Sequence, residues 1–482
     1  EFTFEERSKI GFQYIQDLMD PCSPYGQERL RRIRAYRPDE RDELETELYN
    51  LGQLKYHMSE RSREIHAIRH GYMQMKDIRR AVKKAREMCL SDIELFEIKN
   101  FLLCTERTAV SRMRLTIGLD LKDLEYRNTR KALELLDPEG RLLPAFGMYD
   151  SFSEKLREIR VRKRAVERRL ADAAEEEREA IQEERRLIVV EEEEEELKIR
   201  QRLTDELRPY LDDIEYNAEM TGRWDLLLEK ASLANKAKTV RPVIAEGPLK
   251  LRQAVSPNVA DILKEERREF TPVDIELGRG STVITGANMG GKSVTLHTVA
   301  LNAYLALCGF YVYAECAEIP HFEDIVLVSD EMQSVKAGLS GFGAEVAGLE
   351  RAVEAAERSY CLILVDEFAR GTNPHEGEQL VRAIVKFFNK SRNAALFVTH
   401  YDHIAEHAAA HYQVKGLAEM DPEKVQYEIA AAGKAKGAQV IASHMNYGLI
   451  KVADAKECPK EALAVCRLLG LDERIMALAE EE

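Results

Sequence analysis

Apolar residues recur at helical spacing along the first 240 residues. They fall three and four positions apart with charged residues between them, which is typical of amphipathic helices. Prolines and glycines at 21–26, 38, 137–140 and 144–147 separate these segments and mark helix ends more readily than strand pairs. We therefore predict a helical bundle or arm, with helices at 5–20, 38–61, 75–89, 91–104 and 119–136.

The segment 152–216 has the most unusual pattern of this region. It contains no glycine, and its single proline is Pro209. The stretch 155–169 is rich in lysine and arginine, whereas 172–196 is acidic and ends in six consecutive glutamates. Two long antiparallel helices with complementary faces satisfy this pattern, and we predict the turn between them near 186–190.

The basic run at 155–169 has two interpretations. It can contact nucleic acid, because lysine and arginine neutralise phosphates. It can also be a solvated helix that pairs with its acidic neighbour in the chain. We favour the second interpretation, because the acidic block lies where it can neutralise the basic one.

Short apolar runs alternate with helical segments in the C-terminal half, which is the pattern of an α/β domain. Three of these runs, at 283–285, 361–365 and 394–398, predict buried parallel strands. Each ends at residues that can carry chemistry, and open α/β sheets bind ligands at the carboxyl ends of their strands. We therefore predict an α + α/β fold, in which an all-helical region, 1–240, precedes a domain with a mostly parallel sheet, 241–482.

Residues 286–293 read Gly-Ala-Asn-Met-Gly-Gly-Lys-Ser and fit the phosphate-loop pattern G-x-x-x-x-G-K-[ST]. Glycines let backbone N–H groups line a concavity of phosphate size. Lys292 supplies a cation to the β- and γ-phosphates, and the Ser293 hydroxyl can bind Mg²⁺. The alternative is a glycine-rich turn without a ligand, but an accidental match in such a chain has a chance of roughly 1–2%. The predicted nucleotide contacts are Gly286, Ala287, Asn288, Met289, Gly290, Gly291, Lys292, Ser293 and Val294.

An acidic pair, Asp366-Glu367, follows the second predicted strand. Four apolar residues before such a pair match the Walker B pattern of nucleoside triphosphatases. Asp366 then belongs to the Mg²⁺ site together with Ser293, and Glu367 polarises the attacking water. The alternative is an ordinary helix N-cap region. We favour the catalytic interpretation, because a phosphate loop lies upstream.

Two further residues are candidates for contacts with phosphate. His400 follows the third predicted strand, in the same sheet as the phosphate loop, so we predict that it senses a γ-phosphate as a catalytic residue. A single histidine is otherwise more often a surface or core residue. Ser340 precedes a helical stretch at 344–358, where it can occupy an anion-binding helix N-terminus or be a plain N-cap.

Composition adds exclusions to this picture. The chain has 482 residues, with 71 Lys and Arg, 86 Asp and Glu and a net charge of -15, which neither requires nor excludes a local basic surface. Eight cysteines occur without a C-x-x-C motif, which is typical of a reducing compartment. The apolar run 294–314 contains His297, Asn302 and Gly309, so we predict a buried helix and strand instead of a membrane span. We see no signal peptide and expect a cytoplasmic protein.

These motifs, in this order, resemble the ABC-class ATPases and most closely the MutS family of DNA mismatch-repair ATPases. The resemblance is carried by 285–293, by Leu364-Val-Asp-Glu-Phe-Ala-Arg-Gly-Thr372 and by Val398-Thr-His-Tyr401. Weaker similarity lies in Phe270-Thr-Pro-Val-Asp274, in Tyr447-Gly448 and in 21–30. Ala287 stands where the family usually has proline, and Val294 where it usually has threonine.

The resemblance implies an ATPase that uses ATP and Mg²⁺ and forms a homodimer through its ATPase domain. It implies that Phe270 lies against the adenine and that Ser340 faces the nucleotide of the partner. Residues 1–240 would be the core and lever arms, and residues 241–482 the P-loop ATPase and dimerisation domain. The family's mismatch-recognition domain would have to precede residue 20, so we expect it to be lacking. We also see no strand-rich clamp between 155 and 230.

Two hypotheses for the function follow from the resemblance and its departures. In the first, a dimer couples ATP turnover to clamping on duplex or structured DNA without mismatch specificity. In the second, the arms grip protein, and the chain is an ATP-driven remodeller or chaperone of a metabolic complex that does not bind DNA. The family resemblance slightly favours the DNA-clamping hypothesis over the protein-remodelling hypothesis. A small-molecule kinase has no use for Ser340 and His400 and is set aside.

Overall fold

The protein is described by a computed structural model that covers residues 2–144, 147–286, 291–329, 341–401, 403–417, 420–432, 437–452 and 462–480. The chain forms two compact units. The first contains Glu1–Met19, Arg34–Tyr49 and Leu233–Glu482, and the second contains Asp20–Ile33 and Asn50–Ser232. The functional division at residue 240 stays a prediction.

Helices build the N-terminal part of the chain, as the spacing of its apolar residues predicts. They are α1 (Phe4–Lys9), α2 (Phe12–Asp17), α3 (Pro24–Arg31), α4 (Arg41–His57), α5 (Ser62–Met73), α6 (Arg79–Ala85), α7 (Asp92–Thr116), α8 (Arg130–Leu136), α9 (Glu154–Asp172), α10 (Glu175–Leu207) and α11 (Leu211–Lys236). Short 3-10 helices lie at Pro38–Glu40, Asp150–Phe152 and Arg208–Tyr210. The stretch 147–236, which is fully described, contains no strand.

Several predicted helix boundaries were wrong. The helix expected at 5–20 is broken at Gly11, whose φ of 84° is left-handed, and α5 lies where no helix was predicted. Of the helix expected at 119–136, only α8 forms. The backbone before α8 bonds to asparagine side chains instead: the Lys122 N–H donates to Asn50 Oδ1 at 2.9 Å, and the Arg127 N–H donates to Asn217 Oδ1 at 2.8 Å.

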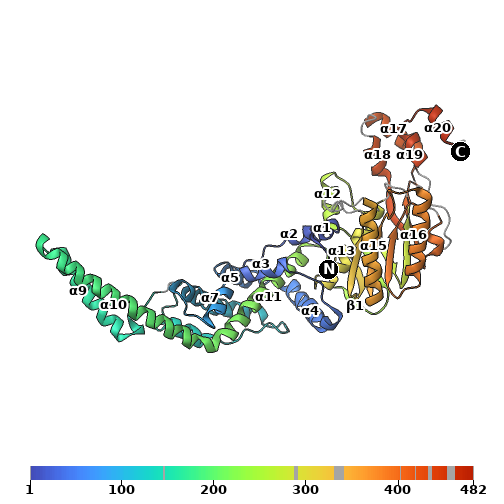
Figure 1. The fold of residues 1–482 in the computed structure, drawn as a ribbon. Helices are drawn as coiled ribbons and strands as arrows, with labels where there is room; N and C mark the ends of the chain where they lie inside the picture. Colours follow the sequence, from blue (N-terminus) through green and yellow to red (C-terminus); the bar gives the residue numbers. More distant parts are fainter. Residues whose placement is uncertain are drawn as a thin grey trace. The chain divides into compact units, whose positions relative to one another are not determined.

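Helices α9 and α10 form the predicted antiparallel hairpin and lie side by side (Figure 1). Its turn is at Ala173 and Ala174, so the predicted turn near 186–190 was wrong. Both alanines have extended backbone, with ψ of 140° and 158°, and they carry none of the glycine or proline signals of a turn. The seam between the helices is apolar and consists of Ile159, Val166, Ile181 and Ile188. At 33 residues, α10 is about 50 Å long.

Ion pairs flank this seam. Arg160 bonds Glu192 at 2.9 Å, Glu196 at 2.9 Å and Asp150 at 2.7 Å. Seven of the eight lysines and arginines between 155 and 169 have an acidic partner within 4.0 Å; these seven are Lys155, Arg157, Arg160, Arg162, Lys163, Arg164 and Arg169. The structure therefore favours pairing of the basic run with its neighbours over a free basic surface.

The first unit contains two sheets. The strands are β1 (Val243–Ala245), β2 (Leu249–Ala254), β3 (Val273–Leu277), β4 (Gly280–Thr285), β5 (Cys316–Pro320), β6 (Asp324–Val328), β7 (Cys361–Asp366), β8 (Ala394–Val398), β9 (Ala410–Gly416) and β10 (Asn446–Lys451). One sheet has the order β1-β5-β2-β3, and the other has the order β10-β9-β4-β8-β7-β6. In the larger sheet, β9, β4, β8, β7 and β6 pair in parallel, and β10 pairs antiparallel to β9.

The three strands predicted from apolar runs are β4, β8 and β7, which are neighbours in the larger sheet. Val398 pairs with Ile284 on one side and with Asp366 on the other, so the carboxyl ends of the three strands lie level. This register brings together the residues that follow each strand.

The helices of this part of the chain are α12 (Pro257–Glu265), α13 (Lys292–Leu307), α15 (Gly341–Arg358), α16 (Pro374–Asn389), α17 (Pro422–Ala432), α18 (Gly437–His444), α19 (Ala462–Leu468) and α20 (Glu473–Glu480), with a 3-10 helix at Ala405–His407. Of these, α13, α15 and α16 contact strands of the larger sheet (Figure 1), whereas α17 contacts α18 and α19, and α19 contacts α20. Helices α15 and α16 share one apolar core with β7 and β8, and α13 contacts β7, β8 and β2. Within the described ranges, no helix combines enough length and apolar character to span a membrane.

Candidate functional site

The ends of the predicted phosphate loop are built around two glycines. Gly286 follows β4 with φ of 141°, and Gly291 precedes α13 with φ of 71°. A Cβ at Gly286 would lie 3.0 Å from Val414 Cβ, and one at Gly291 would lie 3.0 Å from Tyr447 Cδ1. Only glycine meets both conditions without strain. Ala287, Asn288, Met289 and Gly290 lie outside the described residues.

Lys292 is buried at the start of α13, with 3% of its surface exposed. Its Nζ donates to the Gly286 carbonyl at 2.7 Å and lies 3.7 Å from Glu367 Oε1. The cation is therefore held at the Gly286 carbonyl and beside a carboxylate. Val294, two positions further along α13, is half-buried and follows Ser293.

Ser293 and Asp366 form the second contact of the site. The Ser293 hydroxyl donates to Asp366 Oδ1 at 2.8 Å, which joins the first turn of α13 to the end of β7. Burial raises the pKa of Asp366, while the bond from Ser293 acts in the opposite direction. A hydroxyl and a carboxylate that already touch provide two oxygen ligands of the kind that Mg²⁺ prefers.

Glu367 has a strained backbone, with φ of 45° in a non-glycine residue. Its N–H donates to the Val398 carbonyl at 3.0 Å, and Arg370 bonds its Oε2 at 2.9 Å. The strain turns the chain out of β7 so that the Glu367 side chain lies near Lys292 while Asp366 contacts Ser293. Strained residues of this kind concentrate at functional sites.

The loop after Glu367 is anchored by buried polar contacts. The Ala369 N–H donates to Glu345 Oε2 at 2.6 Å, and the Tyr401 hydroxyl donates to the Ala369 carbonyl at 2.9 Å. A Cβ at Gly377 would lie 2.2 Å from the Tyr401 hydroxyl oxygen, so glycine is required there. These contacts tie α15, β7, β8 and α16 together beside the site.

His400 follows β8 and stacks near Tyr401, with ring centroids 4.4 Å apart. Its Nδ1 is buried without a hydrogen-bond partner among the described residues. Burial lowers the pKa of His400, Glu367 opposes this shift, and Lys292 adds to it, so the ring is neutral near pH 7. A neutral ring in this place can donate one hydrogen bond to a phosphate oxygen.

The remaining predicted residues are not joined to this cluster by described contacts. Ser340 lies outside the described residues, immediately before α15. Phe270 is half-buried in the segment between α12 and β3. Its neighbour Arg268 donates to the Tyr447 hydroxyl at 3.3 Å, and Tyr447 lies against Gly291, so this segment runs near the phosphate loop.

Sequence reasoning did not assign site roles to His297, Arg370 or Glu345. His297 Nε2 lies 3.8 Å from Asp366 Oδ2, and Arg370 and Glu345 make the contacts given above. One signal in the sequence could have indicated His297: it lies four positions after Ser293 on a predicted helix, and residues four apart share a helix face.

The residues present fit a nucleotide with Mg²⁺. A Cβ would be strained at both glycines, a buried ammonium contacts the Gly286 carbonyl, and the adjacent Ser293 forms a hydroxyl–carboxylate pair with Asp366. In the described part of the chain, no group of three or more His, Cys, Asp or Glu residues is arranged to hold a metal. A cation at Ser293 and Asp366 would therefore take its other ligands from water and phosphate, as Mg²⁺ commonly does.

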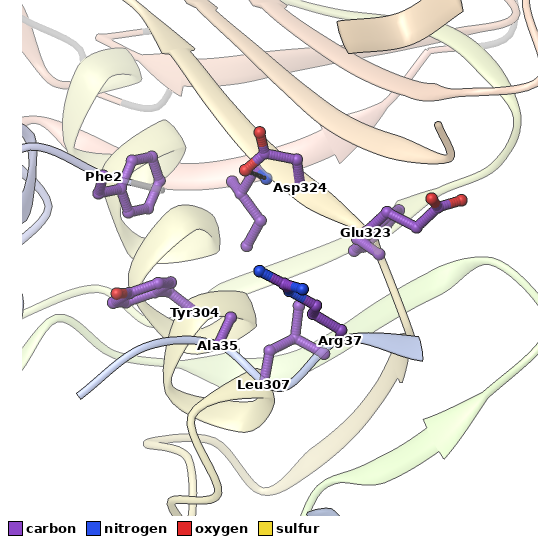
Figure 2. Close-up of a pocket in the computed structure, with 9 residues that line it drawn as sticks. Phe2, Ala35, Arg37, Tyr304, Leu307, Glu323 and Asp324 are labelled. Atoms are coloured by element: carbon purple, nitrogen blue, oxygen red, sulfur yellow. Dashed lines mark hydrogen bonds between the residues drawn. The ribbon is translucent and has the colours of Figure 1, made fainter. Parts of the chain in front are cut away.

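A separate cavity of about 220 Å³ lies at the amino end of β6 (Figure 2). Asp324 at the start of β6, Leu307 at the end of α13, and Tyr304, Phe2 and Arg37 lie around it. None of the predicted site residues belongs to its lining. Because small-molecule sites typically occupy roughly 300–1,000 Å³, we assign no ligand to this cavity.

Comparison with known proteins identifies a matching family model and relatives that align with part of the chain. Residues 282–469 match the family model described as MutS domain V. The chain is 31% identical to the Endonuclease MutS2 of Caldanaerobacter subterraneus subsp. tengcongensis over 215 residues, which are 44% of this chain and 26% of the relative. It is 30% identical to the DNA mismatch repair protein MutS of Syntrophomonas wolfei subsp. wolfei over 290 residues, which are 59% of this chain and 31% of the relative.

The aligned part of the chain thus spans between 26% and 31% of the length of these two relatives. The segment matched by the family model begins in β4, contains α13, the Asp366-Glu367 pair and β8, and reaches beyond α19. Through residues 282–469, the chain is therefore similar to domain V of MutS proteins.

Proposed function

We propose that the chain is a Mg²⁺-dependent ATPase that hydrolyses ATP to ADP and phosphate. The observation that carries this proposal is the convergence of Lys292, the Ser293–Asp366 pair and Glu367 where the carboxyl ends of β4, β8 and β7 lie level. A buried cation, an oxygen-rich metal pair and a carboxylate are the parts that phosphoryl transfer to water requires.

In this proposal, each residue has a distinct task. Backbone N–H groups at 286–291 and Lys292 hold the β- and γ-phosphates, and Ser293 and Asp366 would hold Mg²⁺. Bound there, Mg²⁺ would neutralise negative charge on the phosphate oxygens. Glu367 accepts a hydrogen bond from the water that attacks the γ-phosphorus. The bond from that phosphorus to the bridging oxygen breaks, and its electron pair leaves with ADP.

Two other residues complete the proposed site. His400 is neutral and follows β8, so it can donate one hydrogen bond to an oxygen of the γ-phosphate. Phe270 lies against the adenine. Both roles come from the MutS resemblance and are supported by the position of each residue in the chain fold near β8 and Tyr447.

We further propose a homodimer through the ATPase domain, in which Ser340 faces the nucleotide of the partner. Turnover is coupled to clamping on duplex or structured DNA. The names of the relatives support the proposal that DNA is bound: one is a DNA mismatch repair protein and another an endonuclease. The homodimer and the role of Ser340 rest on the MutS resemblance.

One observation favours a second candidate, an ATP-driven remodeller whose arms grip protein. The α9–α10 hairpin uses its lysines and arginines in ion pairs with Glu191, Glu192 and their neighbours. Because these charges are already neutralised, the hairpin offers few cations for DNA phosphates. A DNA-binding surface would have to lie elsewhere on the chain.

The two candidates are separated by measuring ATP hydrolysis together with DNA binding. Fluorescence titrations with single-stranded, duplex and branched DNA at two salt concentrations give the affinity and its salt slope. Binding that ATP strengthens and salt weakens steeply supports the DNA candidate, because salt competes for phosphates. Hydrolysis without DNA affinity at low salt supports the remodeller. The absence of hydrolysis and of nucleotide binding would overturn the proposed ATPase.

A further inference from the structure

His297 lies one helical turn after Ser293 on α13, and both side chains point at the same carboxylate. Ser293 donates to Asp366 Oδ1 at 2.8 Å, while His297 Nε2 lies 3.8 Å from Asp366 Oδ2. The two oxygens of Asp366 are therefore approached by two residues of one helix face. One approach is a hydrogen bond, and the other is too long to be one.

The His297 ring has an unused donor at this position. Its Nε2 is buried and has no hydrogen-bond partner among the described residues, although 24% of the side chain is exposed. A buried polar nitrogen without a partner lowers stability, and a catalytic role or a bound ion is one of the explanations for such a group. A neutral imidazole ring can carry its proton on Nε2 and donate it there.

We propose that His297 is a positioning residue for the metal. With Mg²⁺ at the Ser293–Asp366 pair, the His297 Nε2–H donates to Asp366 Oδ2 and fixes the orientation of the carboxylate. This inference rests on the proposed ATPase function and adds a residue to which neither the MutS resemblance nor the relatives assign a role.

The arrangement has a physical reason. A carboxylate held at one oxygen can rotate about its Cβ–Cγ bond, and each rotation moves the oxygen that faces the metal. A second hydrogen bond removes this freedom, and loss of such an outer contact typically lowers metal affinity about 10–100-fold. Ser293 cannot supply the second bond, because its hydroxyl has one proton and donates it to Oδ1.

Two substitutions separate a hydrogen bond from simple packing. In His297→Gln, the side-chain amide nitrogen reaches about as far as Nε2 and can still donate to Asp366. In His297→Asn, the amide reaches only as far as Nδ1 and cannot. Both variants keep a neutral polar side chain on α13, so they form a matched pair.

The experiment measures the affinity for a fluorescent ADP analogue, first with EDTA and then across a Mg²⁺ titration. We expect His297→Asn to raise the half-saturating Mg²⁺ concentration about 10–100-fold, and His297→Gln to stay within about threefold of wild type. Affinity in EDTA, which also reports correct folding, should stay within about twofold for both variants, because the metal contact is then absent.

The outcomes distinguish this inference from the proposed function. If His297→Asn keeps the wild-type Mg²⁺ dependence, or if the asparagine and glutamine variants lose it equally, His297 is not a positioning donor. If the wild-type chain binds the nucleotide without any metal dependence, or does not bind it, the proposed ATPase fails, and this inference fails with it.

Discussion

The α9–α10 hairpin and the carboxyl ends of β4, β7 and β8 in the larger sheet both concentrate charged side chains, but the charges have different roles in the two regions. In the hairpin, Arg160 alone has three acidic partners, and the pairs lie along the outside of an apolar seam. At the carboxyl ends of these strands, Lys292 is buried and shares a small site with Asp366 and Glu367.

The comparison shows that a high density of charged side chains indicates structural pairing in one region and function in the other. Exposed pairs along a helix contribute modestly and help to hold two helices together. Buried charges at strand ends are costly and are not needed to close a sheet, so their presence indicates function. Substitutions should therefore have different effects in the two regions. At the carboxyl ends of β4, β7 and β8 they should lower ATP turnover without lowering stability. In the hairpin they should lower stability without lowering ATP turnover.

Among the substitutions that compare the two regions, a large effect is expected for Lys292→Met. Methionine keeps the apolar stem and loses the cation, so turnover should fall about 10²–10³-fold, as it does when a donor to a reacting oxygen is removed. Hydrogen exchange of α9–α10 peptides should be unchanged. The measurement is steady-state phosphate release, with exchange followed on the same preparation. If Lys292→Met hydrolyses ATP at the wild-type rate, Lys292 has no role in catalysis.

A smaller effect is expected for Ile188→Ala in the hairpin seam. Ile188 is 7% exposed and packs among Ile159, Val166 and Ile181. Its truncation should lower local stability by about 2 kcal/mol, measured by hydrogen exchange of peptides from α10. Nucleotide affinity should not change. The matched control is Leu187→Ala, because Leu187 is 64% exposed. If both variants lower the local stability of α10 equally, the proposed packing of Ile188 in the apolar seam is wrong.

The smallest effect is expected for Glu192→Gln. Burial acts to raise the pKa of Glu192, but bonds from Lys163 and Arg160 outweigh it and hold the pKa below its ordinary value of 4.5. The stability that this carboxylate contributes is thus present above pH 4.5 and is lost as the pH falls through its folded pKa.

At neutral pH, Glu192→Gln should therefore destabilise the hairpin by about 1 kcal/mol, and the difference from wild type should shrink towards zero as the pH falls below the folded pKa of Glu192. Hydrogen exchange of wild type and variant, compared at the same pH, measures this difference. The control is Glu193→Gln at the exposed neighbouring position. A destabilisation that persists unchanged at low pH would show that lost charge is not its cause.

Local patterns in the sequence were sufficient to predict β4, β7 and β8 and the candidate site residues at their carboxyl ends. The three apolar runs became β4, β7 and β8, and the loop and acidic pair follow β4 and β7. Each feature is encoded by consecutive residues, because glycine conformation, strand burial and strand ends are local properties. The fold class was also predicted in outline, as a helical N-terminal region followed by α/β structure.

Features that depend on long-range packing could not be predicted. Ala173 and Ala174 turn the chain only because the seam residues of α9 and α10 pair across it. The backbone at Lys122 leaves the helix because Asn50, 72 residues away in the chain, bonds both its N–H and its carbonyl. The role of His297 depends on how α13 packs on β7, which no sequence spacing specifies.

The most direct test of the account is the turnover of Glu367→Gln beside wild type. Single-turnover hydrolysis, nucleotide affinity and light scattering are measured on the same samples. We predict that the variant binds ATP with nearly wild-type affinity, that its hydrolysis falls about 10²–10⁴-fold as expected for loss of a general base, and that it accumulates ATP-bound dimers. Hydrolysis by the variant at the wild-type rate would contradict the central claim that the carboxylate after β7 is there for chemistry.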